Sequence, residues 1–191
     1  MLKLFISTYN ETIIIGLIKD TTLIDEMEYK TFKSHSEFIV PMIKSILEKN
    51  KYNVNNLNEI IVVNGPGSFT GTRLGVTDAK MLAYTLNIPI KTITSIEAIA
   101  LSLPEPNKIV CISDNKGKYI GEFKDNILIK DIYYVKNELA NQIFSDSSSK
   151  VYIDNKIILE NILPYLETLH VVPTHSASPV YIKTIEVLSD K

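Results

Sequence analysis

The chain has 191 residues, of which 45% are hydrophobic and 22% are charged, and its formal net charge at pH 7 is −2. This balance is ordinary for a globular protein and excludes a chain that grips a nucleic-acid backbone through a strongly basic face. A single cysteine, Cys111, excludes a disulfide framework and favours a reducing compartment. No apolar run approaches the length of a membrane span, and the start MLKLFISTYN is too short and polar for a signal peptide, so we expect a cytoplasmic protein.

The first part of the chain predicts an antiparallel meander followed by a helix. Three β-rich runs with short breaks between them are expected at residues 2–8, 11–18 and 22–30. The run SHSEFIVPMIKSILEK then predicts a helix over 34–49, because Ser34 can cap it and Glu37 follows at the spacing of a capping box. A loop rich in asparagine separates this helix from the next strand.

Strands and helices alternate from residue 59 onward, which is typical of an α/β fold. Up to residue 102 we expect a strand at 59–63, a helix at 70–87, a strand at 90–93 and a helix at 95–102 with Thr94 or Ser95 as its cap. Further along, strands are expected near 108–113, 117–123, 127–135, 150–153 and 168–172, and helices near 137–144 and 156–166.

The stretch LPEPN (103–107) is the best candidate for a domain boundary, because its prolines interrupt any regular element there. We therefore predict an N-terminal lobe over 1–103 and a smaller, divergent C-terminal lobe over 107–191, with a tail that returns to the N-terminal lobe. Mixed sheets flanked by helices are expected in this two-lobed α/β arrangement.

A glycine-rich turn, NGPGSFTGTRLG over 64–75, holds four of the seven glycines of the chain. It is not a P-loop, because Gly71 is followed by Thr72 and Arg73 where that loop has lysine and then serine or threonine. It also misses the dinucleotide fingerprint G-x-G-x-x-G, whose third glycine would fall on Thr70. The turn alone leaves two interpretations open: a tight strand-to-helix connection, or an anion site at the helix N-terminus.

The two long helices carry more apolar surface than one core contact needs. On 35–49 the apolar residues cover more of the circumference than a single buried stripe. On 70–87 a main stripe of small residues suits close packing on a sheet, and a second stripe contains Leu74, Met81 and Tyr84 with Thr77 inside it. Surplus apolar faces on neighbouring helices indicate an interface with a partner or a second copy. The alternative is that the second lobe, or one helix, covers the extra stripe.

Three segments resemble, in order, parts of the TsaB (YeaZ) family. The block GPGSFTGTRLGVTDAKMLAYTLNIPIKTITSIEAIA (65–100) resembles that family's glycine-rich turn, helix and following strand. SHSE (34–37) resembles its HSE helix start, and PVYIK (179–183) resembles its C-terminal P-x-Y-[LI]-[RK] motif. Residues 107–170 carry little of the resemblance.

The resemblance implies a reduced actin/Hsp70-type (ASKHA) two-lobed fold. It also implies a non-catalytic role in making threonylcarbamoyladenosine, the modified base beside the tRNA anticodon. Members of this family, also called glycoprotease-like, pair with the related catalytic subunit TsaD through the two helices described above and recruit the ATPase TsaE. On this reading the chain meets tRNA only within that complex and meets no membrane.

Three departures agree with a chain that is not itself an enzyme. In the related catalytic proteins an acidic residue of the first hairpin helps to hold metal and phosphates, and Ser7 stands where many family members have Asp. The catalytic relatives carry H-x-x-x-H as a metal site, but here Ile39 stands four residues after His35. An adenosine pocket of this fold uses glycine-rich loops in the second lobe, and the chain has no glycine after Gly121. We therefore expect no catalytic, cofactor-binding or metal-binding residue and no cofactor.

The predicted partner interface consists of His35, Phe38, Met42, Leu74, Thr77, Met81 and Tyr84. The predicted structural turn, which positions the second long helix for docking, consists of Gly65, Pro66, Gly67, Ser68 and Gly71. Two alternatives remain open: a small ASKHA-type ATPase or metallopeptidase-like enzyme, and a stand-alone homodimer that pairs through the same helices.

Overall fold

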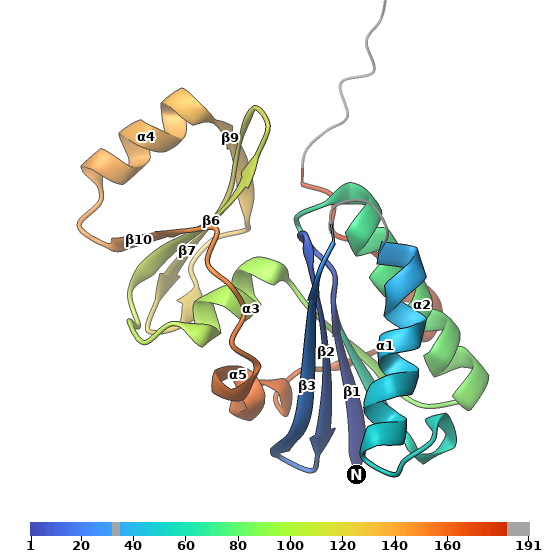
Figure 1. The fold of residues 1–191 in the computed structure, drawn as a ribbon. Helices are drawn as coiled ribbons and strands as arrows, with labels where there is room; N and C mark the ends of the chain where they lie inside the picture. The colour runs from blue at the N-terminus through green and yellow to red at the C-terminus, as the bar shows by residue number, and fades with distance from the viewer. Residues whose placement is uncertain (32–34, 183–191) are drawn as a thin grey trace, which may run out of the picture.

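The computed structural model describes residues 1–31 and 35–182 (Figure 1). Within them the chain forms a six-stranded sheet and a five-stranded sheet, with helices packed against both. The expected cap Ser34 and the last residue of the PVYIK segment, Lys183, lie outside the described residues. No helix in this described part is long and apolar enough to cross a bilayer.

The first sheet has the strand order β11-β5-β4-β1-β2-β3. Its strands are β1 (Leu2–Ser7), β2 (Thr12–Lys19), β3 (Thr22–Lys30), β4 (Glu59–Val63), β5 (Ile90–Ile93) and β11 (Val171–Val172). The first three form the expected antiparallel meander, while β1, β4 and β5 run parallel to one another. Because the carboxyl ends of parallel strands meet at one edge, the β1–β2 hairpin and the glycine-rich turn after β4 emerge side by side.

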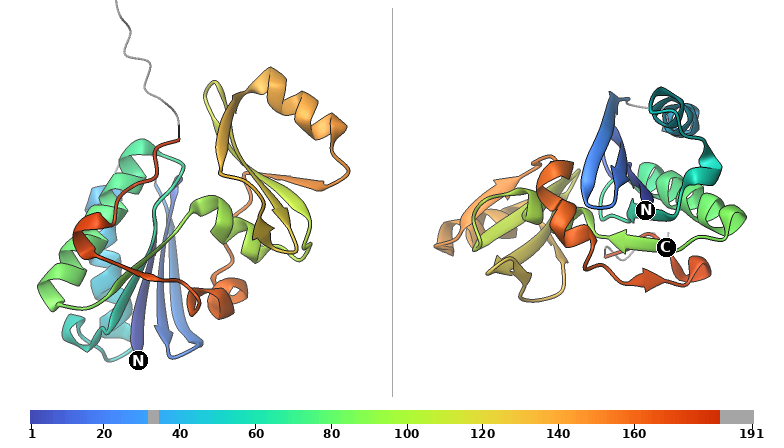
Figure 2. Two further views of the ribbon diagram at one scale, coloured as in Figure 1. Left: turned by 180° about the vertical axis from the view of Figure 1, so that it is seen from behind. Right: turned by 90° about the horizontal axis from the view of Figure 1, so that it is seen from below.

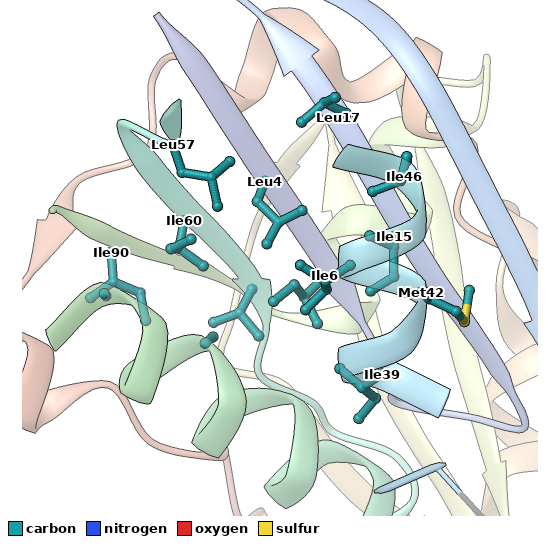
Figure 3. Close-up of a cluster of buried hydrophobic side chains, with 14 of the residues drawn as sticks. Leu4, Ile6, Ile15, Leu17, Ile39, Met42, Ile46, Leu57, Ile60 and Ile90 are labelled. Atoms are coloured by element: carbon teal, nitrogen blue, oxygen red, sulfur yellow. The ribbon is translucent and has the colours of Figure 1, made fainter. Parts of the chain in front are cut away.

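Two helices cover one face of the first sheet and lie next to each other (Figure 1). They are α1 (His35–Lys49) and α2 (Phe69–Leu86), and a 3-10 turn, η1 (Val54–Asn56), follows α1. Side chains on alternate positions of β1 point toward these helices, as the strand period of two requires. The core between helices and sheet is formed mainly by leucine and isoleucine (Figure 3), including Leu4, Ile6, Ile15, Leu17, Ile39, Ile46 and Ile60.

The opposite face of the first sheet packs on α3 (Ser95–Ser102) and α5 (Leu159–Leu166). Thr94 caps α3 as expected: its Oγ1 accepts from the Glu97 N–H at 3.1 Å, and the Glu97 carboxylate accepts from the Thr94 N–H at 3.2 Å. The same core reaches Val110 and Phe123 of the second sheet, so α3 and α5 form a layer between the two sheets.

The second sheet has the order β10-β6-β7-β8, with β9 also paired to β7. Its strands are β6 (Lys108–Asp114), β7 (Gly117–Lys124), β8 (Ile127–Leu128), β9 (Tyr133–Lys136) and β10 (Lys150–Ile153). The helix α4 (Asn137–Asp146) packs on its outer face around Ile120 and Ala140.

Three expected elements beyond residue 120 are wrong in extent. The single strand predicted over 127–135 is two strands, β8 and β9, because 129–132 leave the ladder between them. The helix predicted over 156–166 begins at Leu159. Ile157 lies before it in an extended segment and packs its side chain into the core between the sheets. The strand predicted over 168–172 pairs with β5 only through Val171 and Val172.

The tail runs back along the first sheet (Figure 2). After β11 comes the 3-10 turn η2 (Thr174–Ser176), in which the carbonyl of His175 accepts from Lys80 Nζ at 3.1 Å. Val180 N–H then donates to the carbonyl of Asn64 at 2.8 Å, so this part of the tail lies beside the glycine-rich turn.

Candidate functional site

The glycine-rich turn presses α2 against the β1–β2 hairpin. A Cβ on Gly71 would stand 2.3 Å from the carbonyl oxygen of Thr8, and one on Gly67 would stand 2.2 Å from that of Tyr9. Thr8 Oγ1 donates to the carbonyl of Gly71 at 2.8 Å, and the Ser68 N–H donates to the carbonyl of Tyr9 at 2.6 Å. Only glycine lets the two backbones approach this closely.

The same turn is tied to two further segments. Gly65 adopts a positive φ of +93°. Its carbonyl accepts a hydrogen bond from the Ser95 N–H at 2.8 Å, and Ser95 Oγ donates to the carbonyl of Pro66. The tail holds the turn from the other side, because Asn64 Nδ2 donates to the carbonyl of Ser178 at 3.2 Å. Ser68 Oγ caps α2 by accepting from the Gly71 N–H at 3.2 Å. The five predicted turn residues thus lie at the junction of the hairpin, α2, α3 and the tail.

His35 joins the start of α1 to the hairpin. Its ring is buried, and Nε2 donates to the carbonyl of Asn10 at 2.8 Å. Ser7, at the end of β1, is fully buried, and its Oγ has no hydrogen-bond partner among the described residues. Over 1–31 and 35–182, no three His, Cys, Asp or Glu side chains are grouped so that they could hold a metal ion.

A small apolar pocket of about 320 Å³ lies between α1, α2 and the loop that follows α1. Its walls are mostly aliphatic and aromatic, and the residues that line it are Val40, Ile43, Lys44, Leu47, Glu48, Tyr52, Asn53, Val54, Asp78, Met81 and Leu82. Val40 is 52% exposed and Met81 53% exposed on its two sides. Tyr84, one turn farther along α2, is 80% exposed. We call this surface, with the pocket at its centre, the α1–α2 face.

The predicted interface residues divide between this face and the core. Thr77, Met81 and Tyr84 are exposed on α2, and Leu74 is partly buried there. Met42 is buried in the core, and the partly buried Phe38 packs on Tyr29 of β3 with ring centroids 4.3 Å apart. Of the residues that line the pocket, the predicted interface contains only Met81. The sequence did not assign the others to one site, among them Tyr52, Asn53 and Val54 in the loop and Asp78 in the helix. The apolar loop residues were the available signal.

A larger groove of about 1630 Å³ separates the hairpin and glycine-rich turn from the second sheet. It is lined by Tyr9, Asn10, Pro66 and Gly67 on one side and by Ile112, Asp114, Lys116, Tyr119 and Tyr134 on the other, with Tyr181 from the tail. Burial, with a contribution from Asp154, raises the pKa of the Tyr9 phenol, so this side chain stays neutral at physiological pH. Charges of both signs line the groove, so it has no strong preference for anions.

The family model and several of the relatives that match this chain are named for the threonylcarbamoyl modification of adenosine in tRNA. A family model described as TsaD, tRNA N6-adenosine threonylcarbamoyltransferase, matches residues 29–121. The chain is 32% identical over 148 residues to the tRNA threonylcarbamoyladenosine biosynthesis protein TsaB of Bacillus subtilis, covering 78% of this chain and 62% of that protein. It is 30% identical over 152 residues to the TsaB protein of Buchnera aphidicola subsp. Acyrthosiphon pisum, covering 69% of each.

A solved structure of YeaZ from Pseudomonas aeruginosa has the same fold. It superposes with a TM-score of 0.79 at 15% identity, over 94% of this chain and 99% of that one. A second crystal structure from that organism, described as similar to peptidase YeaZ, has a TM-score of 0.80. The predicted two-lobed α/β fold with mixed sheets flanked by helices is therefore confirmed.

Proposed function

The chain belongs to the TsaB (YeaZ) family, and from that premise we propose that it takes part in the biosynthesis of threonylcarbamoyladenosine in tRNA as a non-catalytic scaffold and activator. Its direct partner in this proposal is a TsaD-like catalytic subunit, and a TsaE-like ATPase joins the pair. The chain meets tRNA only within the complex. We place the chain in the cytoplasm, because its single cysteine is free and buried, as is common in proteins of a reducing compartment.

The α1–α2 face carries this proposal. The face has an apolar pocket at its centre, and the side chains of Val40, Met81 and Tyr84 around it are all more than half exposed. Exposed apolar surfaces of this kind are typical of protein–protein interfaces. Aromatic and methionine side chains are enriched at the centres of such interfaces. The junction around the glycine-rich turn supports the same assignment, because it fixes α2 against the hairpin while His35 fixes the start of α1.

The direct test is light scattering after size exclusion, on the chain alone and mixed with the TsaD-like protein from the same cell. A one-to-one heterodimer is the expected result, whether the chain alone is a monomer or a homodimer. A chain that ignores the partner at micromolar concentrations contradicts the scaffold proposal.

Charged substitutions on the α1–α2 face should weaken this heterodimer. Met81→Arg and Tyr84→Glu each place a charge on the apolar surface, and we expect each to raise the Kd by about 30-fold, since such a charge must lose water on docking. The matched control is Ile127→Arg, an apolar residue of β8 that is 68% exposed and lies on the second sheet. Unchanged affinity for both α2 variants, measured by calorimetry, would place the interface elsewhere.

We also expect no binding of ATP with magnesium to the isolated chain at micromolar concentrations. The Ser68 and Gly71 N–H groups of the turn already have acceptors within the chain, which leaves less of a cradle for phosphates. Calorimetric titration of ATP and MgCl₂ into the chain alone measures this. Clear micromolar binding would favour the ATPase alternative, with the large groove as its site.

A further inference from the structure

Asp78 lies on the wall of the apolar pocket between α1 and α2. It is partly buried, and its carboxylate makes no hydrogen bond or ion pair with any residue of the described ranges. Burial raises its pKa above the ordinary value for aspartate, so the unpartnered charge is already costly in the free chain. Its neighbours on the wall, Met81 and Leu82, offer no polar group in return.

No lysine or arginine on α1 or α2 forms an ion pair with Asp78. Each of the four contacts another group of the chain: Lys44 with Glu48, Lys49 with Asp25, Lys80 with the carbonyl of His175, and Arg73 with the ring of Phe69. The pocket wall carries a second carboxylate, Glu48, but Lys44 pairs with it at 3.7 Å. Among the residues that line the pocket, Asp78 is therefore the carboxylate without a cation partner.

A protein that covered the pocket with apolar side chains alone would strip the remaining water from this carboxylate. An unpaired buried charge is among the most costly features of an interface, whereas a paired one improves specificity. A second copy of the chain offers a second Asp78, and the cation that lines its pocket, Lys44, is already paired with Glu48. Self-pairing across this pocket thus buries the charge twice without neutralising it.

We propose that Asp78 selects the occupant of the α1–α2 face: a partner protein whose apolar docking surface carries one lysine or arginine that reaches this carboxylate, in preference to a second copy of the chain. This inference rests on the proposed function, in which the occupant is the TsaD-like catalytic subunit. Asp78 acts in it as a specificity determinant, with the pocket supplying the apolar contact.

The test compares Asp78→Asn with the unchanged chain. The amide keeps the size of the side chain and removes its charge. Glu138→Gln is the matched control, because Glu138 is an exposed helical acid on α4 beyond the second sheet. Binding to the TsaD-like protein is measured by calorimetry between 50 and about 500 mM NaCl, and self-association by light scattering of each chain alone.

The expected result is that Asp78→Asn raises the heterodimer Kd about tenfold, flattens its salt dependence and strengthens self-association, while Glu138→Gln changes none of these. Asp78→Lys should weaken the heterodimer further, which separates loss of the charge pair from a local packing change. If the unchanged chain binds and Asp78→Asn binds as tightly, the inference is overturned and the scaffold proposal stands. If the unchanged chain does not bind at all, both are overturned.

Discussion

Gly71→Ala is expected to lower the free energy of unfolding by about 3 kcal/mol, although alanine is intrinsically the better helix former. The new Cβ would stand 2.3 Å from the carbonyl oxygen of Thr8, far inside van der Waals contact. Relief requires α2 to move away from the hairpin, which also breaks the 2.8 Å hydrogen bond from Thr8 Oγ1 to the Gly71 carbonyl. Helix propensity alone would give the opposite sign, by up to about 1 kcal/mol.

Urea unfolding followed by circular dichroism measures this, with Thr70→Ala as the control. Thr70 is the exposed neighbour in the same helical turn, and its loss should change stability by less than about 0.5 kcal/mol. A Gly71→Ala chain as stable as the unchanged one would mean that the turn tolerates a side chain. The close approach would then not explain its glycines.

Gly75 allows a sharper form of the same test. A Cβ there would stand 2.2 Å from Thr8 Oγ1, so its clash is with a side chain and not with backbone. Thr8→Ala should therefore recover part of the loss caused by Gly75→Ala, by about 1–2 kcal/mol in a double-mutant cycle. The same Thr8 substitution should recover nothing in Gly71→Ala, because every residue at position 8 keeps its carbonyl. Equal recovery in both cycles would contradict the assigned contacts.

The elements up to residue 102 could be predicted closely from the sequence, because local signals there agree with the tertiary contacts. The strand predicted at 59–63 and the helix predicted at 95–102 have those bounds in the structure, and Thr94 with Glu97 forms the capping box. The helix predicted over 70–87 is displaced by one residue at each end, with Ser68 as its cap. Periodicity, caps and turn residues all act within a few positions of each other, so sequence carries them well.

Beyond residue 120 the sequence predicts strand character but not pairing. The run ILIKDIYYV has the composition of one long strand, yet β8 and β9 pair with different ends of β7. Which residues pair is decided by partners far along the chain, and periodicity contains no record of them. The extended Ile157 is a similar case, since the core between the sheets and not its local sequence holds it outside α5.

The candidate site shows the same division. The second stripe of α2, with Met81 and Tyr84, follows from helical geometry and is exposed as that geometry predicts. On α1 the apolar residues cover so wide an arc that helical geometry also places Met42 in the interface, but Met42 is buried against the first sheet. The pocket needs the loop residues Tyr52 and Val54 to fold back beside both helices, and no local pattern predicts that arrangement.

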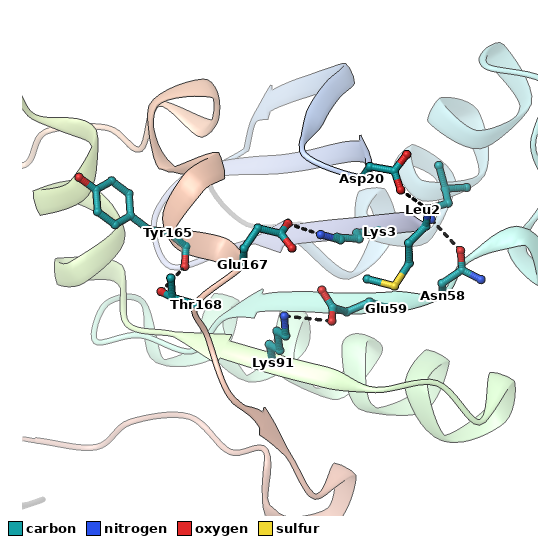
Figure 4. Close-up of polar contacts among 10 residues, drawn as sticks. Leu2, Lys3, Asp20, Asn58, Glu59, Lys91, Tyr165, Glu167 and Thr168 are labelled. Atoms are coloured by element: carbon teal, nitrogen blue, oxygen red, sulfur yellow. Dashed lines mark hydrogen bonds and ion pairs between the residues drawn. The ribbon is translucent and has the colours of Figure 1, made fainter.

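Buried lysines were the least predictable feature, because lysine in a sequence normally indicates surface. Among the described residues, three lysines are almost fully buried: Lys3, Lys91 and Lys108. Lys108 Nζ donates to the carbonyls of Ala100 and Leu103 at 2.5 and 3.0 Å, so it closes the C-terminal end of α3. Lys3 pairs with Glu167, and Lys91 pairs with Glu59 (Figure 4).

Lys91→Ala is expected to cost about 3–5 kcal/mol, because it leaves Glu59 buried without its cation. Lys91 Nζ lies 3.1 Å from Glu59 Oε2, and the two side chains are only 9% and 4% exposed. Lys3 is opposite Glu59 in the β1–β4 register, but Glu167 already engages it. For a chain of this size the loss should lower Tm by about 6–20 °C. Lys44→Ala, which breaks the exposed pair with Glu48, is the control and should change Tm little.

The double substitution Lys91→Met with Glu59→Leu separates the two halves of this argument. If the cost of Lys91→Ala comes from the charge left behind, replacing both partners by apolar side chains should restore most of the stability. If it comes from lost packing of the lysine stem against β4, Lys91→Met alone should be almost as stable as the unchanged chain. Thermal unfolding of the single and double variants decides between them. Because β4 leads directly into the glycine-rich turn, the pair also anchors the strand on which α2 depends.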